Sequence, residues 1–248
     1  IMYGLTGVGS AFAGAVSDYV DYNNIMTTTR AILGTHDKGG NFSGRFSNME
    51  NNIRKIGMRT KFTAPEVAAA SKFLAMAGLD IKSINESMPA ITDIALVADS
   101  DLSETADVVT NIMTAYQMKP DKMREVADKM TMAFTMSNTT LMEMAESYKY
   151  FASIAAHEGM DFTDTTAMIG LLGDAGLKGS HAGTTIRQIF NNLKKPNKAM
   201  KELLSETGIK LNGDDGKLRP LFDIFTDLSK NNALDKAFEI FRVTAAQG

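Results

Sequence analysis

The sequence predicts an all-α protein, an array of short antiparallel helices with one small β-hairpin near residues 209–218. Three observations predict this class. Apolar residues recur at spacings of three and four along most of the chain. Ser, Thr, Asp or Pro opens successive segments of about 15 residues, and turns of two to six residues join them. Outside residues 209–220, no stretch alternates between apolar and polar residues, as a half-buried strand would.

Composition limits the classes of function. The chain has 248 residues, 44% hydrophobic and 22% charged, which is typical of a soluble folded protein with a buried core. Its net charge of -3 indicates no general attraction to nucleic acid or to anionic membranes. The absence of cysteine excludes disulfides and thiolate metal sites. The 17 methionines suit helical cores, because Met side chains adapt to several neighbours.

The first 17 residues carry no charge and are rich in Gly, Ser and Thr. They fall short of the roughly 20 apolar residues that a membrane span needs, and they lack the basic start of a secretory signal. We expect a small-residue helix packed against copies of itself or against other protein, and a membrane-active segment is the alternative. The chain begins on Ile1 and ends just past a helical pattern, at Gln247 and Gly248, so we expect a piece of a longer protein.

The next segments complete a predicted N-terminal domain. Apolar and aromatic residues at helical spacing predict a helix over residues 18–33, and residues 34–44 form a predicted glycine-rich loop. A second helix is expected over residues 45–58. We therefore divide the chain into residues 1–60, N-terminal helices and a Gly-rich loop that pack on other chains, and residues 61–248, a helical core domain.

Capping signals mark the starts of the following helices. A capping box pairs Ser, Thr or Asp with a Glu three residues later, and Pro fits the first helical turn because no N–H is needed there. Pro89 either bends a helix over residues 84–98 or starts it. The predicted start signals are Thr63-Ala-Pro-Glu66, Asp101 with Glu104, Thr140 with Glu143, and Asp161.

Near the C-terminus the pattern changes briefly. Asn212-Gly-Asp-Asp-Gly216 stands between short apolar pairs and predicts the tip of the small hairpin. Two further helices are expected over residues 220–230 and 235–246.

A glycine-rich stretch over residues 170–190 invites comparison with a phosphate-binding loop. Such a loop needs a lysine that directly follows a glycine, and it must come after a β-strand. Here the order is Lys178-Gly179-Ser180, and the preceding element is a predicted helix. Both requirements fail, so no nucleotide cofactor is expected.

The same stretch instead predicts a junction between two helices. We expect Gly173 and Gly176 to end the first helix and Gly179 to allow a tight turn. Ser180 is expected to cap the second helix, and Gly183 to let a further helix approach closely. The predicted structural motif comprises Gly176, Lys178, Gly179, Ser180, Gly183 and Arg187. Of these, Lys178 and Arg187 are the candidates for contact with a partner protein.

The remaining polar residues indicate no catalytic or metal site. The three histidines, His36, His157 and His181, lie far apart in sequence. His157-Glu158 superficially resembles a zinc-peptidase helix, but no second histidine follows at the required spacing. Carboxylates are dispersed over helix starts, where capping accounts for them. We therefore expect no enzyme, no cofactor and no bound metal.

Several segments, kept in order, resemble the core region of phage tail tape measure proteins. The most specific is Ala175-Gly-Leu-Lys-Gly-Ser180, followed by Ala182-Gly-Thr184 and Arg187, which resembles that family's helix-turn-helix signature. The resemblance spans roughly residues 18–228. The other segments that carry it cover residues 62–80, 103–118, 124–130, 137–156 and 212–228.

This resemblance implies a structural virion protein that fills the tail lumen, templates assembly and length of the tail tube, and leaves ahead of the DNA during ejection. It implies as partners copies of the same chain, the tail tube protein, tail tip or baseplate hub proteins, and tail assembly chaperones. No specific nucleic acid is implied. The expected location is the phage tail, in the tube lumen or at the tip, and the host cytoplasm during assembly.

The chain departs from the family in one respect, because it lacks the long uninterrupted helical stretches that would span a tail tube. We therefore expect a globular part of a tape measure protein. Two alternatives stay open: a membrane-active helical segment that aids genome passage through the cell envelope, and a generic helical-repeat binding module.

Overall fold

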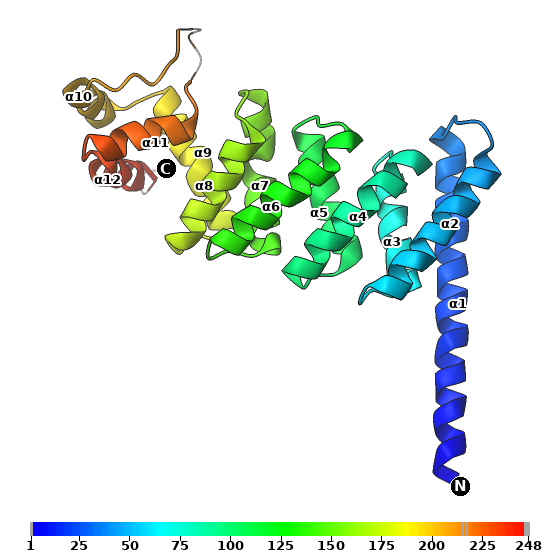
Figure 1. Cartoon of the computed structure of the whole chain (residues 1–248). Coiled ribbons are helices and arrows are strands. Elements are labelled where there is room, and N and C mark those ends of the chain that lie inside the picture. Colours follow the sequence, from blue (N-terminus) through cyan, green and yellow to red (C-terminus); the bar gives the residue numbers. More distant parts are fainter. Residues whose placement is uncertain (1, 215, 217, 246–248) are drawn as a thin grey trace. The chain divides into compact units, whose positions relative to one another are not determined.

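The computed structural model describes residues 2–214, 216 and 218–245, with side chains at 14, 16–35, 37–214, 216 and 218–241. It confirms the all-α prediction, and Figure 1 shows the helices along the chain. The prediction that the chain is a piece of a longer protein depends on Ile1, Gln247 and Gly248, which lie outside the described residues. In chain order the helices are α1 (Met2–His36), α2 (Phe42–Arg59), α3 (Ala64–Met76), α4 (Ile81–Ala98), α5 (Leu102–Ala115), the short 3-10 helix η1 (Pro120–Lys122), α6 (Met123–Met136), α7 (Leu141–His157), α8 (Phe162–Asp174), α9 (Ser180–Lys194), α10 (Lys198–Thr207), α11 (Leu221–Lys230) and α12 (Leu234–Ala245).

Capping residues set several helix starts as predicted, whereas the helix expected over residues 84–98 begins earlier. Thr63 forms a reciprocal capping box with Glu66 at the start of α3, where Pro65 lies in the first turn, and Thr140 forms one with Glu143 at α7. Ahead of α5, the Asp101 carboxylate accepts a hydrogen bond from a backbone N–H, and Asp161 does the same ahead of α8. Pro89 lies inside α4, which begins eight residues earlier at Ile81 behind the cap Asp80.

The longest helix corrects a prediction. A helix over residues 18–33 and a loop over 34–44 were expected, whereas α1 is one helix of 35 residues and the loop covers only 37–41. The prediction of helices about 15 residues long is therefore wrong for α1. Each glycine costs a helix only about 1 kcal/mol, and no proline interrupts this segment, so packing of its second half is enough to maintain it. No described helix is long and apolar enough to cross a membrane.

The first compact unit comprises residues 1–114 and 118–128. Within it α1 and α2 pack on α3, and α2 and α3 also contact α4, so helices on both sides of residue 60 share one core. The proposed division at residue 60, with residues 1–60 packing on other chains, stays a prediction. Fully buried side chains in this unit include Leu33, Met49, Ile53, Leu74, Ile81, Ile84, Ile91, Ile94, Leu102 and Met123.

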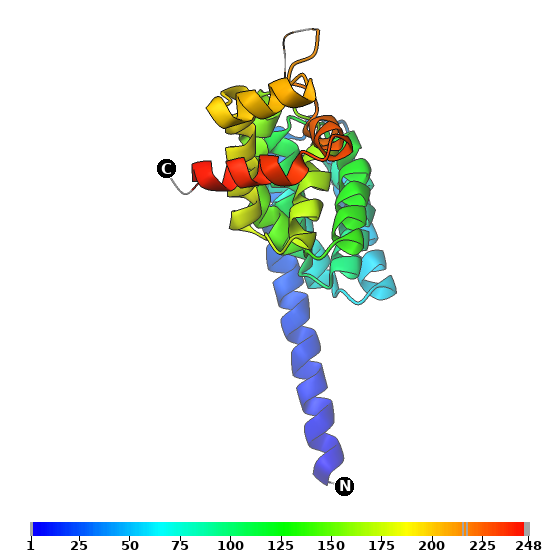
Figure 2. The same ribbon diagram turned by 90° about the vertical axis from the view of Figure 1, so that its left-hand side faces the viewer.

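The second compact unit comprises residues 115–117 and 129–248. Its framework is α7 packed against α8 and α9, with α11 against α8, and α12 against α9, α10 and α11. Figure 2 shows α12, in red, lying across the direction of α8 and α9. Buried aromatic residues in this framework include Tyr148, Phe151, Phe162 and Phe190.

The predicted β-hairpin near residues 209–218 is not formed. The described residues contain no strand, and this segment has an isolated antiparallel bridge between Asn212 and Leu218. One further ladder bond joins the Arg219 N–H to the Leu211 carbonyl at 2.8 Å. Two short apolar pairs supply too few cross-strand contacts to extend this pairing into a ladder. Asp215 and Lys217 of the predicted tip lie outside the described residues.

Candidate protein-contact site

The glycine-rich stretch forms the turn between α8 and α9. Gly176 has φ +82°, and the Leu177 N–H donates to the Leu172 carbonyl at 2.8 Å, so α8 ends in the left-handed motif that glycine favours. Gly179 has φ +56° and ψ -132°, a conformation that residues with a Cβ rarely adopt. The two glycines together let the chain reverse within five residues.

Two predictions for this turn are wrong in detail. Gly173 lies inside α8, where a Cβ would come within 3.0 Å of the Thr139 Cβ and 3.3 Å of the Asn138 carbonyl oxygen. Its role is therefore close packing, and Gly176 alone supplies the left-handed end. Ser180 is the first residue of α9, and Gly179 occupies the N-cap position without a side-chain cap. The extreme conformation required at the cap position explains why glycine is there and serine is one residue later.

Gly183 marks the closest approach of α9 to α7. A Cβ built there would lie 2.3 Å from the Ser147 carbonyl oxygen and 2.9 Å from the Tyr150 Cβ. The Ser147 hydroxyl lies 2.8 Å from the Gly179 carbonyl, to which it can donate a hydrogen bond. Contact between the two helix backbones at this point holds the turn against α7.

The two candidate contact residues differ in their surroundings. The Lys178 ammonium donates to the Asn138 side chain at 3.1 Å and lies 3.8 Å from the Glu143 carboxylate, so it ties the turn to the start of α7. Arg187 is exposed on α9 and makes no ion pair with any residue that the structure describes. The contact of either residue with a partner stays a prediction.

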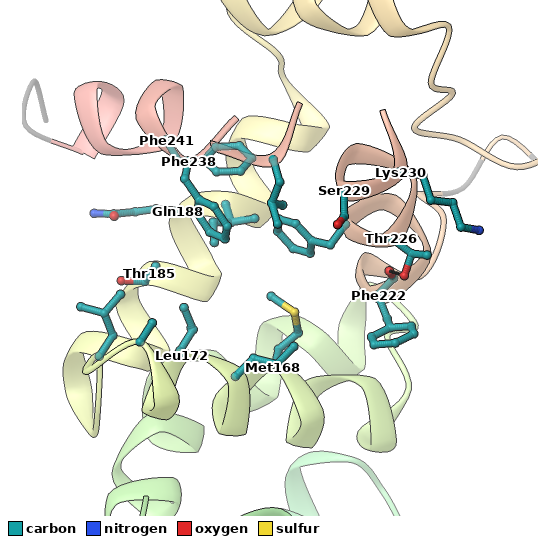
Figure 3. A pocket seen from close by; sticks show the side chains of 16 residues that line it. Met168, Leu172, Thr185, Gln188, Phe222, Thr226, Ser229, Lys230, Phe238 and Phe241 are labelled. Carbon is teal, nitrogen blue, oxygen red and sulfur yellow. Dashed lines mark hydrogen bonds between the residues drawn. The ribbon is translucent and has the colours of Figure 1, made fainter. Parts of the chain in front are cut away.

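Sequence reasoning missed an apolar groove in the second unit. The groove has a volume of about 750 Å³. Figure 3 shows Phe238 and Phe241 on one side and Met168 and Leu172 on the other. Its lining is Met168, Leu171 and Leu172 from α8, Ala175 and Leu177 from the turn, Thr185, Gln188 and Ile189 from α9, Phe222, Phe225, Thr226, Ser229 and Lys230 from α11, and Leu234, Phe238 and Phe241 from α12.

The groove continues onto a wider apolar surface. A second groove of about 330 Å³ shares Leu171 and Phe222 with the first and adds Met132 and Met136 from α6. These four side chains are 54%, 50%, 63% and 76% exposed, respectively. Large exposed apolar side chains gathered in one place are typical of protein contact surfaces. The periodicity of single helices does not reveal this surface, because side chains from α6, α8, α9, α11 and α12 contribute to it.

The lining of the larger groove is almost entirely apolar. Lys230 is the one charged side chain that lines the larger groove, and it has no carboxylate partner within the described chain. Burial raises the pKa of both Tyr116 and Tyr148, so neither phenol supplies a base at neutral pH. The His157 and His181 side chains are exposed, and no cluster of three His, Asp or Glu side chains suited to a metal occurs among the described residues.

Comparison with known proteins shows which family and which proteins this chain is similar to. The family described as phage-related minor tail protein matches residues 50–241. The chain belongs to that family. The expected resemblance to phage tail proteins is thereby confirmed over most of the chain, from α2 to α12. Among solved structures, none matches this member of the minor tail protein family.

Two proteins that are similar to this chain are a tape measure protein and a probable tape measure protein. The chain is 32% identical over 185 residues to the tape measure protein of Pneumococcus phage Dp-1, covering 75% of this chain and 16% of that protein. It is 26% identical over 250 residues to a probable tape measure protein of Escherichia phage P2, covering 98% of this chain and 29% of that protein. The chain thus spans less than a third of the length of either relative.

Proposed function

We propose that this chain is a globular part of a tape measure protein, which templates assembly and length of the phage tail tube and is released during DNA ejection. The observation that carries the proposal is the family match over residues 50–241 together with the two tape measure relatives. The proposal assigns no bond-making step to the chain. Its contribution is contact with other proteins.

The structure supports a contact role through its exposed apolar surface. The groove between α8, α9, α11 and α12 is large enough to receive several side chains of a partner, and Leu171 and Phe222 stand exposed at its edge. We propose that it receives an apolar helical face of another tail component. The partners of the proposal are copies of the same chain, the tail tube, the tail tip or baseplate hub, and assembly chaperones, within the virion tail and in the host cytoplasm during assembly.

A helical ruler advances about 1.5 Å per residue, so the long helical parts of such a protein set the length, whereas short packed helices add little. In a phage whose tape measure protein carries this chain, an in-frame deletion of 60 residues outside it should shorten the tail by about 90 Å. Electron microscopy of the particles measures this. A deletion that leaves tail length unchanged wherever it is placed would contradict the tape measure function.

The role of the groove is tested in the same phage by replacing Leu171 and Phe222 together with serine. We expect far fewer assembled tails, with unchanged length in the tails that do form. The matched control replaces Met58 and Val97 with serine, because these exposed apolar side chains lie in the other unit and outside the groove. Equal tail numbers in both double variants would remove the groove from the proposal.

A further inference from the structure

Four helices, α3, α5, α7 and α9, bury side chains at one repeating interval. The side chains at one position are each at most 3% exposed: Ser71, Val109, Tyr148 and Ile186. Those four residues further along each helix are at most 5% exposed: Ala75, Met113, Ala152 and Phe190. Both sets are spaced by 38, 39 and 38 residues. This interval is typical of helical-hairpin repeats, in which each hairpin packs on the next.

In the second unit, one face of α7 carries α9. At Gly183 the backbone of α9 comes so close that a Cβ there would lie 2.3 Å from the Ser147 carbonyl oxygen and 2.9 Å from the Tyr150 Cβ. Further along both helices, the Phe151 ring lies 5.9 Å from the Phe190 ring. The two contacts advance together, so α7 and α9 run in the same direction. A small residue on α9, followed seven residues later by an aromatic one, thus fits this face.

The same face of α9, one interval further along the chain, lines the larger apolar groove. The residues 38 positions after Ser147, Tyr150 and Phe151 are Thr185, Gln188 and Ile189. All three line the groove. The side of α9 that corresponds to the α9-binding side of α7 is therefore left without a parallel helix in direct contact along it.

The second helices of the hairpins show the same correspondence. Side chains of α6 line the smaller groove beside α8: Lys129, Met132, Ala133 and Met136. The residues 39 positions later line the larger groove: Met168, Leu171, Leu172 and Ala175. Two walls of the larger groove, on α8 and α9, are thus the faces on which a further hairpin of the repeat would pack.

Helices α10, α11 and α12 cover these faces without continuing the repeat. Helix α12 packs on α9 but lies across its direction, as Figure 2 shows, and a groove of about 750 Å³ remains between them and α8. Helix α10, which follows α9, packs on α12. The Phe225 ring of α11 stacks on the Phe238 ring of α12 at 5.7 Å. These three covering helices therefore hold to one another, and residues 195–197 join them to α9.

We propose that a helix of another tail component displaces the covering helices and packs along α9, as α9 packs along α7. The arriving helix presents a glycine or alanine where it meets Thr185 and Gln188, and a large apolar side chain seven residues later. The covering helices move away about residues 195–197. This rests on the proposed function and deepens it, because it names the class of helix that the groove accepts and the segment that moves.

The probe is a hydrocarbon-stapled peptide of residues 180–194, because α9 is the helix that fits the equivalent face of α7. The staple replaces Arg187 and Asn191, which are exposed on α9, and keeps the peptide helical. Fluorescence anisotropy of the labelled peptide with the 248-residue chain measures its affinity. The peptide should bind, and the same peptide with Gly183→Leu should bind at least about tenfold more weakly, because a side chain there prevents close approach of the backbones.

Two variants of the chain locate the binding. Leu171→Glu should weaken binding of the peptide at least about tenfold, because it places a carboxylate in the apolar contact. Val97→Glu is the matched control, since Val97 and Leu171 are each 54% exposed and Val97 lies in the other unit. Hydrogen exchange of the backbone amides of α11 and α12 should become at least about tenfold faster with the peptide bound, while exchange in α7 stays unchanged.

Four outcomes would overturn the proposal: no binding of the peptide, equal affinity of the two peptides, equal effects of the two chain variants, and faster exchange in α7 and α9 instead of α11 and α12. Binding that leaves exchange in α11 and α12 unchanged would overturn the displacement of the covering helices. Tail length after deletions and tail number in the groove variants are measured without the peptide. Failure of this proposal is therefore distinguishable from failure of the tape measure function.

Discussion

At Gly183 a hydrogen atom in place of a side chain allows α9 to cross α7 in contact with its backbone. The atom that a Cβ would meet is the Ser147 carbonyl oxygen, at 2.3 Å, and a backbone atom cannot move aside as the end of a flexible side chain can. The close packing of these helices therefore depends on one position.

We expect Gly183→Ala to lower the unfolding free energy of the second unit by about 1–3 kcal/mol, because overpacking outweighs the better helix propensity of alanine. Urea denaturation measures this. The control is Gly34→Ala in α1, where a Cβ would meet nothing within 4 Å, so this variant should be neutral or up to about 1 kcal/mol more stable. Equal effects of the two substitutions would contradict the packing role of Gly183.

Asp37 is the buried charge that closes the loop after α1. Its carboxylate accepts two hydrogen bonds from Arg45, at 2.7 and 2.9 Å, and one each from the backbone N–H groups of Gly39 at 3.0 Å and Ile81 at 3.1 Å. The hydrogen bonds from Arg45 contribute most to lowering the pKa of Asp37 from 3.8 to about 2. One side chain thus links α1, the loop and the start of α4.

Because the folded state holds this pKa below its unfolded value, the stabilisation is complete above pH 3.8 and is lost as the pH falls toward 2. We expect Asp37→Asn to lower the unfolding free energy of the first unit by about 2 kcal/mol at neutral pH, with the difference from wild type shrinking below pH 4. Denaturation at a series of pH values measures it. Asp99→Asn removes an exposed partner of Lys61 and should have a smaller effect. If the difference in unfolding free energy between Asp37→Asn and the wild type does not change with pH, the stabilising role of the ionised Asp37 carboxylate is contradicted.

At the scale of one element, the start of α7 combines a cap with a contact to the glycine-rich turn. The Thr140 hydroxyl accepts a hydrogen bond from the Glu143 N–H at 3.2 Å, and the Glu143 carboxylate accepts one from the Thr140 N–H at 2.9 Å. Lys178 lies 3.8 Å from the same carboxylate. The cap therefore orders the helix end on which the turn before α9 rests.

We expect Thr140→Ala to destabilise the second unit by about 1 kcal/mol, because it leaves a backbone N–H of the first turn of α7 without its side-chain partner. Thr135→Ala is the control, since the exposed Thr135 hydroxyl donates only to carbonyls of its own helix, at 2.7 and 3.2 Å. That substitution should be neutral or slightly stabilising. Chemical denaturation monitored by circular dichroism compares the two variants. If Thr140→Ala lowers the unfolding free energy no more than Thr135→Ala does, the capping role of Thr140 is contradicted.

At the scale of the whole molecule, both compact units carry exposed apolar side chains among the residues that the structure describes. On α1 the side chains of Val16, Tyr19 and Val20 are exposed, whereas the second unit presents a groove lined by side chains of α8, α9, α11 and α12. A groove of this kind receives side chains from the apolar face of a partner. We infer that the groove serves the contact with another tail component that is proposed above.

The amino-acid sequence by itself determined the all-α class, the capped starts of several helices and the family. Capping boxes such as Thr63 with Glu66 and Thr140 with Glu143 act within four residues, so local spacing is enough to predict them. The order of the segments over residues 18–228 was enough to indicate a tape measure protein. These features depend on neighbours along the chain.

The tertiary structure decided what depends on distant neighbours. Helix α1 packs on α3 and runs past Gly34 to His36, where the predicted loop was expected to begin at residue 34. The N-cap position before α9 is occupied by Gly179 because of the backbone conformation required there. The isolated bridge replaced the predicted hairpin because too few residues pair across it. The groove joins residues from Met168 to Phe241, and only the packing of four helices brings their side chains together.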